Sequence, residues 1–180
     1  KNGEEIWNFK TDKPLIKSQK KNSLIVKKNN IIFNNSVGDI TAVNSETGEL
    51  VWQAPTQSKK IYDESMFFKN SDLISAKNSI LFSNNNNSFF SLDADSGLVN
   101  WKQKINSNVR PVFFNDLIFT VTNEGYLVVL DNKSGKLIRS NYLLSNFKKK
   151  KRKKIKPVGF IVGQINIYLT LNNGKVLVVD

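Results

Sequence analysis

The sequence predicts an all-β chain built from consecutive four-stranded antiparallel sheets. Aromatic and aliphatic residues come in short runs separated by polar turns, which favours strands over helices. One strand–turn–strand pattern also recurs four times along the 180 residues. Because a repeating unit of this kind buries its apolar faces by stacking on its neighbours, the repeat decides the fold.

The recurring segments are hydrophobic strands that close on Asp or Asn. They span residues 38–44, 87–93, 125–131 and 174–180, and their last residues are 49, 38 and 49 positions apart. The closing side chain can accept hydrogen bonds from backbone N–H groups just downstream, and a glycine four residues later supplies the positive φ of a short bulged hairpin. The closing residues and their glycines are Asn44 with Gly48, Asp93 with Gly97, and Asp131 with Gly135.

A tryptophan follows the turn glycine by four residues in three copies, at Trp7, Trp52 and Trp101. Strict strand alternation would put Trp52 on the same face as Leu50, and Trp101 on the same face as Val99. We expect each indole to pack against the neighbouring unit, because it buries a large apolar area there. Arg139 takes this position in the fourth copy, so the adjacent outer edge should be less well packed.

Two more apolar strands precede each recurring segment. In the clearest unit the expected strands are 109–115, 117–122, 126–131 and 136–143, and four strands in about 40 residues make one blade of a β-propeller. The other expected strands are 23–28, 30–34, 40–44, 50–54, 72–77, 80–83, 89–93, 99–105, 157–162, 165–171 and 175–180. Residues 1–11 are then the outer strand of one blade, blades cover about 12–55, 56–106 and 107–147, and 155–180 is an incomplete blade. We expect a fragment of a larger propeller; the alternative is that the two ends complete one blade and close a four-bladed ring.

The composition excludes several kinds of catalytic and metal-binding site. The chain has neither Cys nor His, which removes disulfides, thiolate and imidazole metal ligands, and mechanisms that use these side chains. No run of about 18 apolar residues is present, so no transmembrane segment is expected. We predict no catalytic, cofactor-binding or metal-ligating set, and no cofactor.

The formal charge of +12 is concentrated in one segment. Eight positive residues lie between positions 148 and 156, and without them the charge is +4. The run Lys148, Lys149, Lys150, Lys151, Arg152, Lys153 and Lys154 falls between two blades. One interpretation is a solvated, mobile loop; the other is a contact with lipid headgroups or an acidic partner. Nucleic acid is disfavoured, because no aromatic side chains are interleaved in the run.

The connection 56–70 is unusually long and contains an apolar cluster, Tyr62, Met66, Phe67 and Phe68. The cluster either packs into the core or forms a surface for a partner protein, since propellers carry function on such loops.

The whole pattern resembles the pyrroloquinoline-quinone-like (PQQ-like) repeat: a Gly, a strand ending in Leu-Asp, three polar residues before a second Gly, and Trp four residues later. The resemblance covers essentially the whole chain and is closest at 44–52 and 93–101. The short, divergent blades are most similar to the BamB family of outer-membrane lipoproteins. That likeness implies eight blades, a periplasmic location at the bacterial outer membrane, and a noncatalytic scaffold that binds other proteins such as the β-barrel insertase.

The same resemblance leaves two other functions open. One is a fragment of a quinone-dependent dehydrogenase, an enzyme class that holds quinone and Ca²⁺ with carboxylates and Asn near the propeller axis. Here Asp93, Asp131 and Asp180 close strands, with Glu46 and Asp95 beside them, and turn capping accounts for all five. The other is a generic propeller sensor or binding domain.

Overall fold

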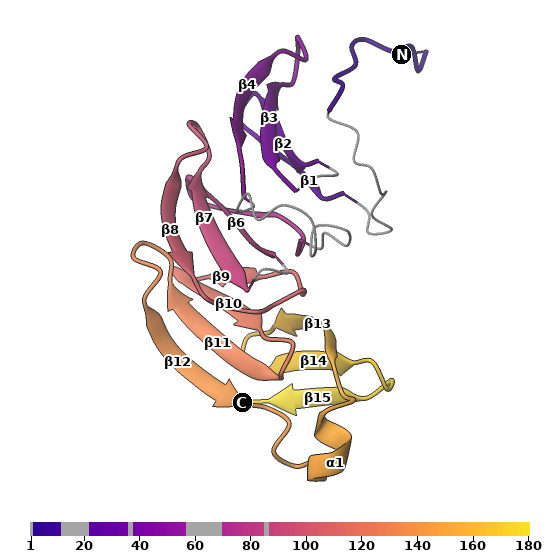
Figure 1. Ribbon diagram of the computed structural model, residues 1–180, viewed down its shortest axis with the longest axis vertical. Coiled ribbons are helices and arrows are strands. Elements are labelled where there is room, and N and C mark those ends of the chain that lie inside the picture. Colours follow the sequence, from indigo (N-terminus) through magenta and orange to yellow (C-terminus); the bar gives the residue numbers. More distant parts are fainter. Residues whose placement is uncertain (1, 12–21, 36–37, 57–69, 85–86) are drawn as a thin grey trace, which may run out of the picture.

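A computed structural model describes residues 2–11, 22–35, 38–56, 70–84 and 87–180. Within these ranges it contains fifteen strands and one short helix, arranged as four successive antiparallel sheets (Figure 1). In every sheet each strand pairs with its neighbours in sequence, so the chain runs as a meander. The prediction of an all-β propeller architecture with four-stranded antiparallel blades is confirmed.

The strands of the first sheet are β1 (Leu24–Lys27), β2 (Asn30–Asn34), β3 (Ile40–Asn44) and β4 (Leu50–Ala54). The second sheet contains β5 (Ile74–Ala76), β6 (Ser79–Asn84), β7 (Ser88–Asp93) and β8 (Val99–Gln103). The third contains β9 (Val112–Phe114), β10 (Leu117–Val121), β11 (Tyr126–Asp131) and β12 (Leu137–Tyr142). The fourth contains β13 (Pro157–Val162), β14 (Ile167–Leu171) and β15 (Val176–Val179), and α1 (Lys149–Arg152) lies in the connection before it.

Several expected strands are shorter in the structure than their apolar runs. β9 begins at Val112 rather than at residue 109, since Pro111 has no N–H to give to a ladder. β5 covers only Ile74–Ala76, and β8 ends at Gln103. Residues 2–11, expected as an outer strand, form no strand with the described part of the chain.

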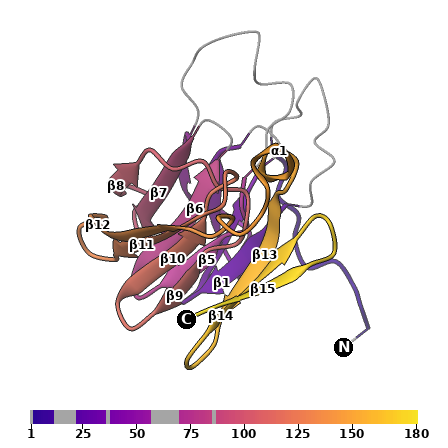
Figure 2. The same ribbon diagram turned by 90° about the horizontal axis from the view of Figure 1, so that it is seen from below.

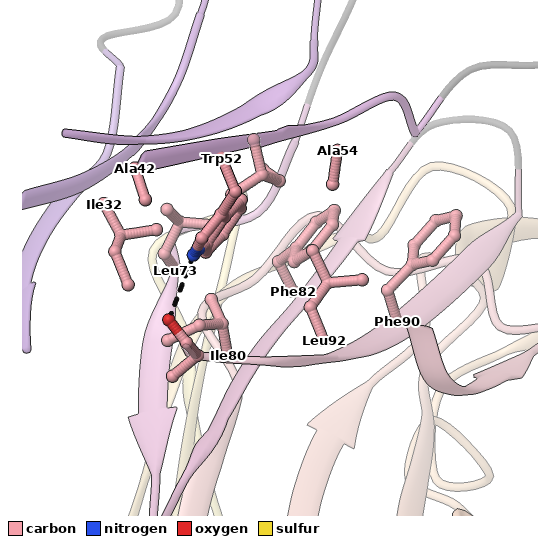
Figure 3. Packing of buried hydrophobic residues seen from close by; sticks show 11 residues of the cluster. Ile32, Ala42, Trp52, Ala54, Leu73, Ile80, Phe82, Phe90 and Leu92 are labelled. Atoms are coloured by element: carbon pink, nitrogen blue, oxygen red, sulfur yellow. Dashed lines mark hydrogen bonds between the residues drawn. The ribbon is translucent and has the colours of Figure 1, made fainter. Parts of the chain in front are cut away.

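The core lies between the sheets rather than within any of them. One buried cluster joins the first and second sheets around Trp52, Phe82 and Phe90 (Figure 3). A second joins the second and third sheets around Phe89 and Trp101. A third cluster joins the third and fourth sheets and includes residues of the connection that carries α1. Neighbouring sheets therefore hold one another together by burying their facing surfaces.

The two ends of the sheets differ in what they carry. The first strands contact each other, β1 with β5 and β5 with β9, while β4, β8 and β12 lie along the outer side (Figure 1). One end, here called the turn end, carries the turns that follow β3, β7 and β11. The opposite end, the loop end, carries the connections between sheets; Tyr126 pairs with Tyr142 there, just before α1. Figure 2 shows α1 at one end and the C-terminal residue at the other.

Candidate functional site

The residues that close the third strand of each complete sheet cap their own turns. The Asn44 Oδ1 atom accepts hydrogen bonds from the backbone N–H groups of Glu46 (2.8 Å) and Thr47 (3.0 Å). The Asp93 Oδ1 atom accepts from the backbone N–H of Ser96 (2.9 Å) and from its hydroxyl (2.8 Å). Asp131 binds Ser134 in the same two ways. An amide and a carboxylate therefore do the same structural work.

Hydrogen bonding in these turns keeps the carboxylates ionised. Partial burial acts to raise the pKa of Asp93, but hydrogen bonds from Ser96 and from the Asp95 backbone outweigh it, and the net pKa lies below its usual range. The Ser134 hydroxyl and backbone N–H lower the pKa of Asp131. General acid–base catalysis at neutral pH works best with a pKa near neutrality, and these hydrogen bonds move the pKa of both carboxylates away from it.

Each repeat tryptophan reaches the turn of the following sheet. The Trp52 indole N–H donates to the Ala94 carbonyl (3.2 Å), shown as the dashed line in Figure 3. The Trp101 indole N–H donates to the Asn132 carbonyl (2.9 Å), and that of Trp7 to the Ser45 carbonyl (3.1 Å). The structure thus places the three indoles between successive units, where each is both packed and hydrogen bonded.

The indoles pack directly against the turn glycines. Gly97 has φ +73°, and a Cβ atom there would lie 2.5 Å from Cε3 of Trp52. A Cβ at Gly48 would lie 2.7 Å from Cδ2 of Trp7, and Gly135 has the same relation to Trp101. Sequence reasoning explained the glycines by the turn alone and missed this contact. We call each set of indole, glycine and carbonyl an indole latch.

Arg139 has no latch. Its side chain is exposed and its Nε atom donates to the Asn141 Oδ1 atom (3.1 Å). The seam between the third and fourth sheets is closed at the loop end instead, where Leu144 is fully buried against Gly125 and Ile155 is almost fully buried.

A β-bulge near the start of β4, β8 and β12 changes which face of the sheet the following side chains take. Val43 pairs with Leu50 while the adjacent Ala42 pairs with Trp52, so one residue between them is skipped. Leu50 and Trp52 therefore lie on opposite faces, and the expectation that they share a face is wrong. The same correction applies to Val99 and Trp101, which pair with the adjacent residues Leu92 and Ser91. A bulge adds one residue and so reverses the alternation.

The bulges leave a repeated pair of aliphatic side chains in solvent at the turn end of each outer strand. Their exposed fractions run from 46 to 71%. The pattern that could have revealed them is two adjacent aliphatic residues just after the turn glycine, where a half-buried strand would alternate. We call this set the aliphatic rim; it contains Leu50, Val51, Leu98, Val99, Leu137 and Ile138.

A polar groove lies between the second and third sheets at the turn end. Its volume is about 660 Å³, and its walls include Asp93, Asp116 and Asp131 together with Lys77 and Lys133. Lys77 forms an ion pair with Asp116. Among the residues that the structure describes, no group of three or more acidic side chains is arranged to hold a metal ion. The carboxylates of the groove are thus committed to turns and to a lysine.

The structure divides the basic run into two parts. The lysines at 148, 149, 150, 151, 153 and 154 are exposed on and around α1, whereas Arg152 is half-buried. The Arg152 Nε atom donates to the Phe147 carbonyl (2.6 Å), and its guanidinium lies 5.7 Å from the centre of the Tyr142 ring. Arg152 thus belongs to the packing of the connection. The apolar cluster of Tyr62, Met66, Phe67 and Phe68 lies outside the described residues.

The repeated turns, indole latches and stacked four-stranded sheets define a PQQ-like repeat β-propeller. The family model described as outer membrane protein assembly factor BamB matches residues 1–141. The chain belongs to the BamB family. No curated protein sequence gives a significant match.

Solved structures share the fold at low sequence identity. BamB from Moraxella catarrhalis superposes with a TM-score of 0.70 at 14% identity, over 97% of this chain and 54% of that one. The chain therefore spans about half the length of that BamB. Quinohemoprotein alcohol dehydrogenase from Comamonas testosteroni gives 0.60 at 13% identity, over 88% and 30% of the two chains. A europium-containing methanol dehydrogenase gives 0.54 at 18% identity, over 67% and 24%. At these identities the likeness shows the fold alone.

Proposed function

We propose that the protein is a noncatalytic, protein-binding scaffold of the outer-membrane β-barrel assembly machinery, located on the periplasmic side of that membrane as a BamB-type lipoprotein. The observation that carries the binding role is the aliphatic rim, which places an exposed aliphatic residue two positions after the turn glycine in each of three sheets. Contiguous exposed apolar side chains on a soluble protein mark contact surfaces. The family match supplies the assembly role. In the described residues no helix is long and apolar enough to cross a membrane.

The geometry of the rim fits a protein partner in an extended conformation. β4, β8 and β12 each end their sheet, so one edge of each strand has no ladder partner among the described residues. A partner strand could add to such an edge through main-chain hydrogen bonds while the rim side chains contact its apolar residues. The three bulges restrict this surface to the turn end, because ladder pairing is irregular there.

Direct binding to the purified outer-membrane β-barrel insertase of the same organism tests the proposal. Changing Leu50, Val99 and Leu137 together to Ser should raise the Kd at least about tenfold, as loss of central apolar contacts does in other interfaces. The matched control changes to Ser three exposed aliphatic residues of β13 and of the turn that follows it: Val158, Ile161 and Ile165. Absence of insertase binding by the unchanged protein, or equal loss in both triple variants, would contradict the proposal.

The alternative function is a fragment of a quinone-dependent dehydrogenase. What supports it is the fold shared with the two dehydrogenases and the three carboxylates among the residues that line the polar groove. The hydrogen bonds that hold Asp93 and Asp131 in their turns argue against it. Titration with pyrroloquinoline quinone in the presence of Ca²⁺, followed by quinone absorbance and dye-linked alcohol oxidation, separates the two functions. Saturable quinone binding would favour the enzyme. A generic propeller sensor would bind neither quinone nor the insertase.

A further inference from the structure

The connection between the third and fourth sheets holds α1 firmly against the loop end. Leu144 is fully buried and Ile155 is 5% exposed, both in the third core cluster. The Leu143 N–H donates to the Gly125 carbonyl (2.9 Å), which ties the start of the connection to the third sheet. The basic run is therefore bracketed by two buried aliphatic anchors rather than carried on an untethered loop.

Hydrogen bonds from the side chains of Arg152 and Asn172 to backbone atoms hold the connection in place. Arg152 donates to the carbonyls of Phe147 and Ser145, which closes the connection over α1. On the other side the Asn172 side chain donates to the Lys154 carbonyl (3.0 Å) and accepts from the Lys156 N–H (2.9 Å). These contacts use main-chain atoms of Lys154 and Lys156, and the Lys154 side chain is exposed, whereas the Lys156 ammonium donates to the Asn123 carbonyl (3.5 Å).

Within its own segment and in the ion pairs of the described residues, the charge of the six lysines has no acidic counterpart. Residues 145–156 contain no Asp or Glu. The two ion pairs of the described chain, Lys28 with Asp95 and Lys77 with Asp116, involve no residue of this run. The capping carboxylates of Asp93 and Asp131 lie at the turn end, whereas α1 lies at the loop end (Figure 2). Glu124, in the turn before β11 at the loop end, accepts a hydrogen bond from the Asn106 side chain (3.0 Å). The described residues thus form a strongly positive surface, here called the lysine surface: Lys148, Lys149, Lys150, Lys151, Lys153 and Lys154.

The shape and chemistry of the lysine surface indicate what it binds. The two grooves between the second and third sheets are not lined by these residues. Lysine ammonium groups act as point charges and lack the fork of arginine for paired recognition of one carboxylate or phosphate. No aromatic side chain stands within the run to stack on a nucleic-acid base. A broad array of headgroup phosphates matches this surface better than a single ligand.

We infer that the loop end docks on an anionic lipid membrane through the lysine surface, with Arg152 as the residue that positions α1. The contact is electrostatic adsorption, since residues 148–154 contain no apolar side chain that could insert. This inference is independent of the proposed scaffold role, because it concerns the opposite end of the sheets from the aliphatic rim.

Co-sedimentation of the full chain with vesicles tests the inference. We expect binding to phosphatidylcholine vesicles that contain 30% phosphatidylglycerol, and none to pure phosphatidylcholine. Changing Lys149, Lys150 and Lys153 to Gln should weaken binding at least about tenfold at low salt, since each lysine near an anionic surface contributes about fivefold. The matched control removes three exposed charges at the turn end and outer strand, in the variant Lys133→Gln, Lys136→Gln, Arg139→Gln. It should change binding less than about twofold.

Equal weakening in both triple variants would overturn the inference, because net charge rather than the lysine surface would then drive binding. So would binding to single-stranded RNA or to an acidic peptide without binding to the anionic vesicles. Failure of the unchanged protein to bind the insertase, with lipid binding retained, would count against the scaffold role alone. Circular dichroism spectra of all variants should superpose, because every changed side chain is exposed.

Discussion

Trp52 in β4 lies against Gly97 in the turn of the next sheet and donates its indole N–H to the Ala94 carbonyl. Trp52 of the first sheet thereby packs against a glycine of positive φ in the second sheet and also donates a hydrogen bond to the backbone of that sheet (Figure 3). The same relation holds for Trp7 with Gly48 and for Trp101 with Gly135. The indole latch therefore joins the first sheet to the second and the second sheet to the third.

Gly97→Ala should destabilise the protein more than a change of backbone strain alone can. Both Gly97 and Gly174 have positive φ, but a Cβ at Gly174 meets nothing within 4 Å. Ala at either site costs about 1–2 kcal/mol in left-handed strain. At Gly97 we expect about 1–3 kcal/mol more from the displaced indole. Urea denaturation of Gly97→Ala and Gly174→Ala measures the difference. Equal midpoints would show that the contact between Gly97 and the Trp52 indole does not contribute to stability.

Trp52→Ala should lower the free energy of unfolding by about 3–5 kcal/mol, as large-to-small changes in cores do. The indole is only 8% exposed and packs among the side chains of two sheets. Arg139→Ala, at the equivalent exposed position of the third sheet, should change stability by less than about 0.5 kcal/mol. An unchanged denaturation midpoint for Trp52→Ala would show that the indole does not join the sheets.

Asp131→Asn should reduce the acid sensitivity of the fold. Ser134 holds the pKa of Asp131 below its usual range, so the folded state binds a proton less readily than the unfolded state. The resulting stabilisation is present above the unfolded pKa of about 4 and is lost as the pH falls through the lower folded pKa. Asn cannot titrate, yet Asn44 makes the same turn.

Thermal melts of the wild type and of Asp131→Asn between pH 7 and pH 2.5 check this expectation. The stability advantage of the wild type should shrink as the pH falls below about 4. The reciprocal variant, Asn44→Asp, should gain acid sensitivity at the first turn. A constant difference between wild type and Asp131→Asn across this range would contradict the role of the carboxylate.

Arg152→Lys should lower the free energy of unfolding by about 1 kcal/mol although it keeps the charge. Lysine cannot reproduce the hydrogen bonds to the carbonyls of Phe147 and Ser145 together with the contact on Tyr142. Lys151→Gln removes a charge from an exposed position of the same helix and should change stability by less than about 0.5 kcal/mol. Equal denaturation midpoints for the two variants would show that Arg152 contributes no more to stability than an exposed lysine does.

Features that depend on a few neighbouring residues could be predicted from the sequence. The side chain of Asn44 reaches the backbone only two and three residues ahead, so the turn could be derived from its residues alone. The repeat, the strand order within each sheet and the location of the basic run between two sheets follow in the same way. The fold class was predictable because these local patterns recur.

Only the tertiary structure decided which face each side chain takes and what it contacts. A single bulged residue, Val51, separates the faces of Leu50 and Trp52 and leaves the aliphatic rim in solvent. Arg152 differs from the lysines around it because its side chain contacts two backbone carbonyls and an aromatic ring. Trp52 and Ala94 are 42 residues apart, and no local rule brings them together. The sequence by itself determined the turns and the repeat, since their energetics are local; the latches, the rim and the position of the lysine surface arise from packing between distant segments.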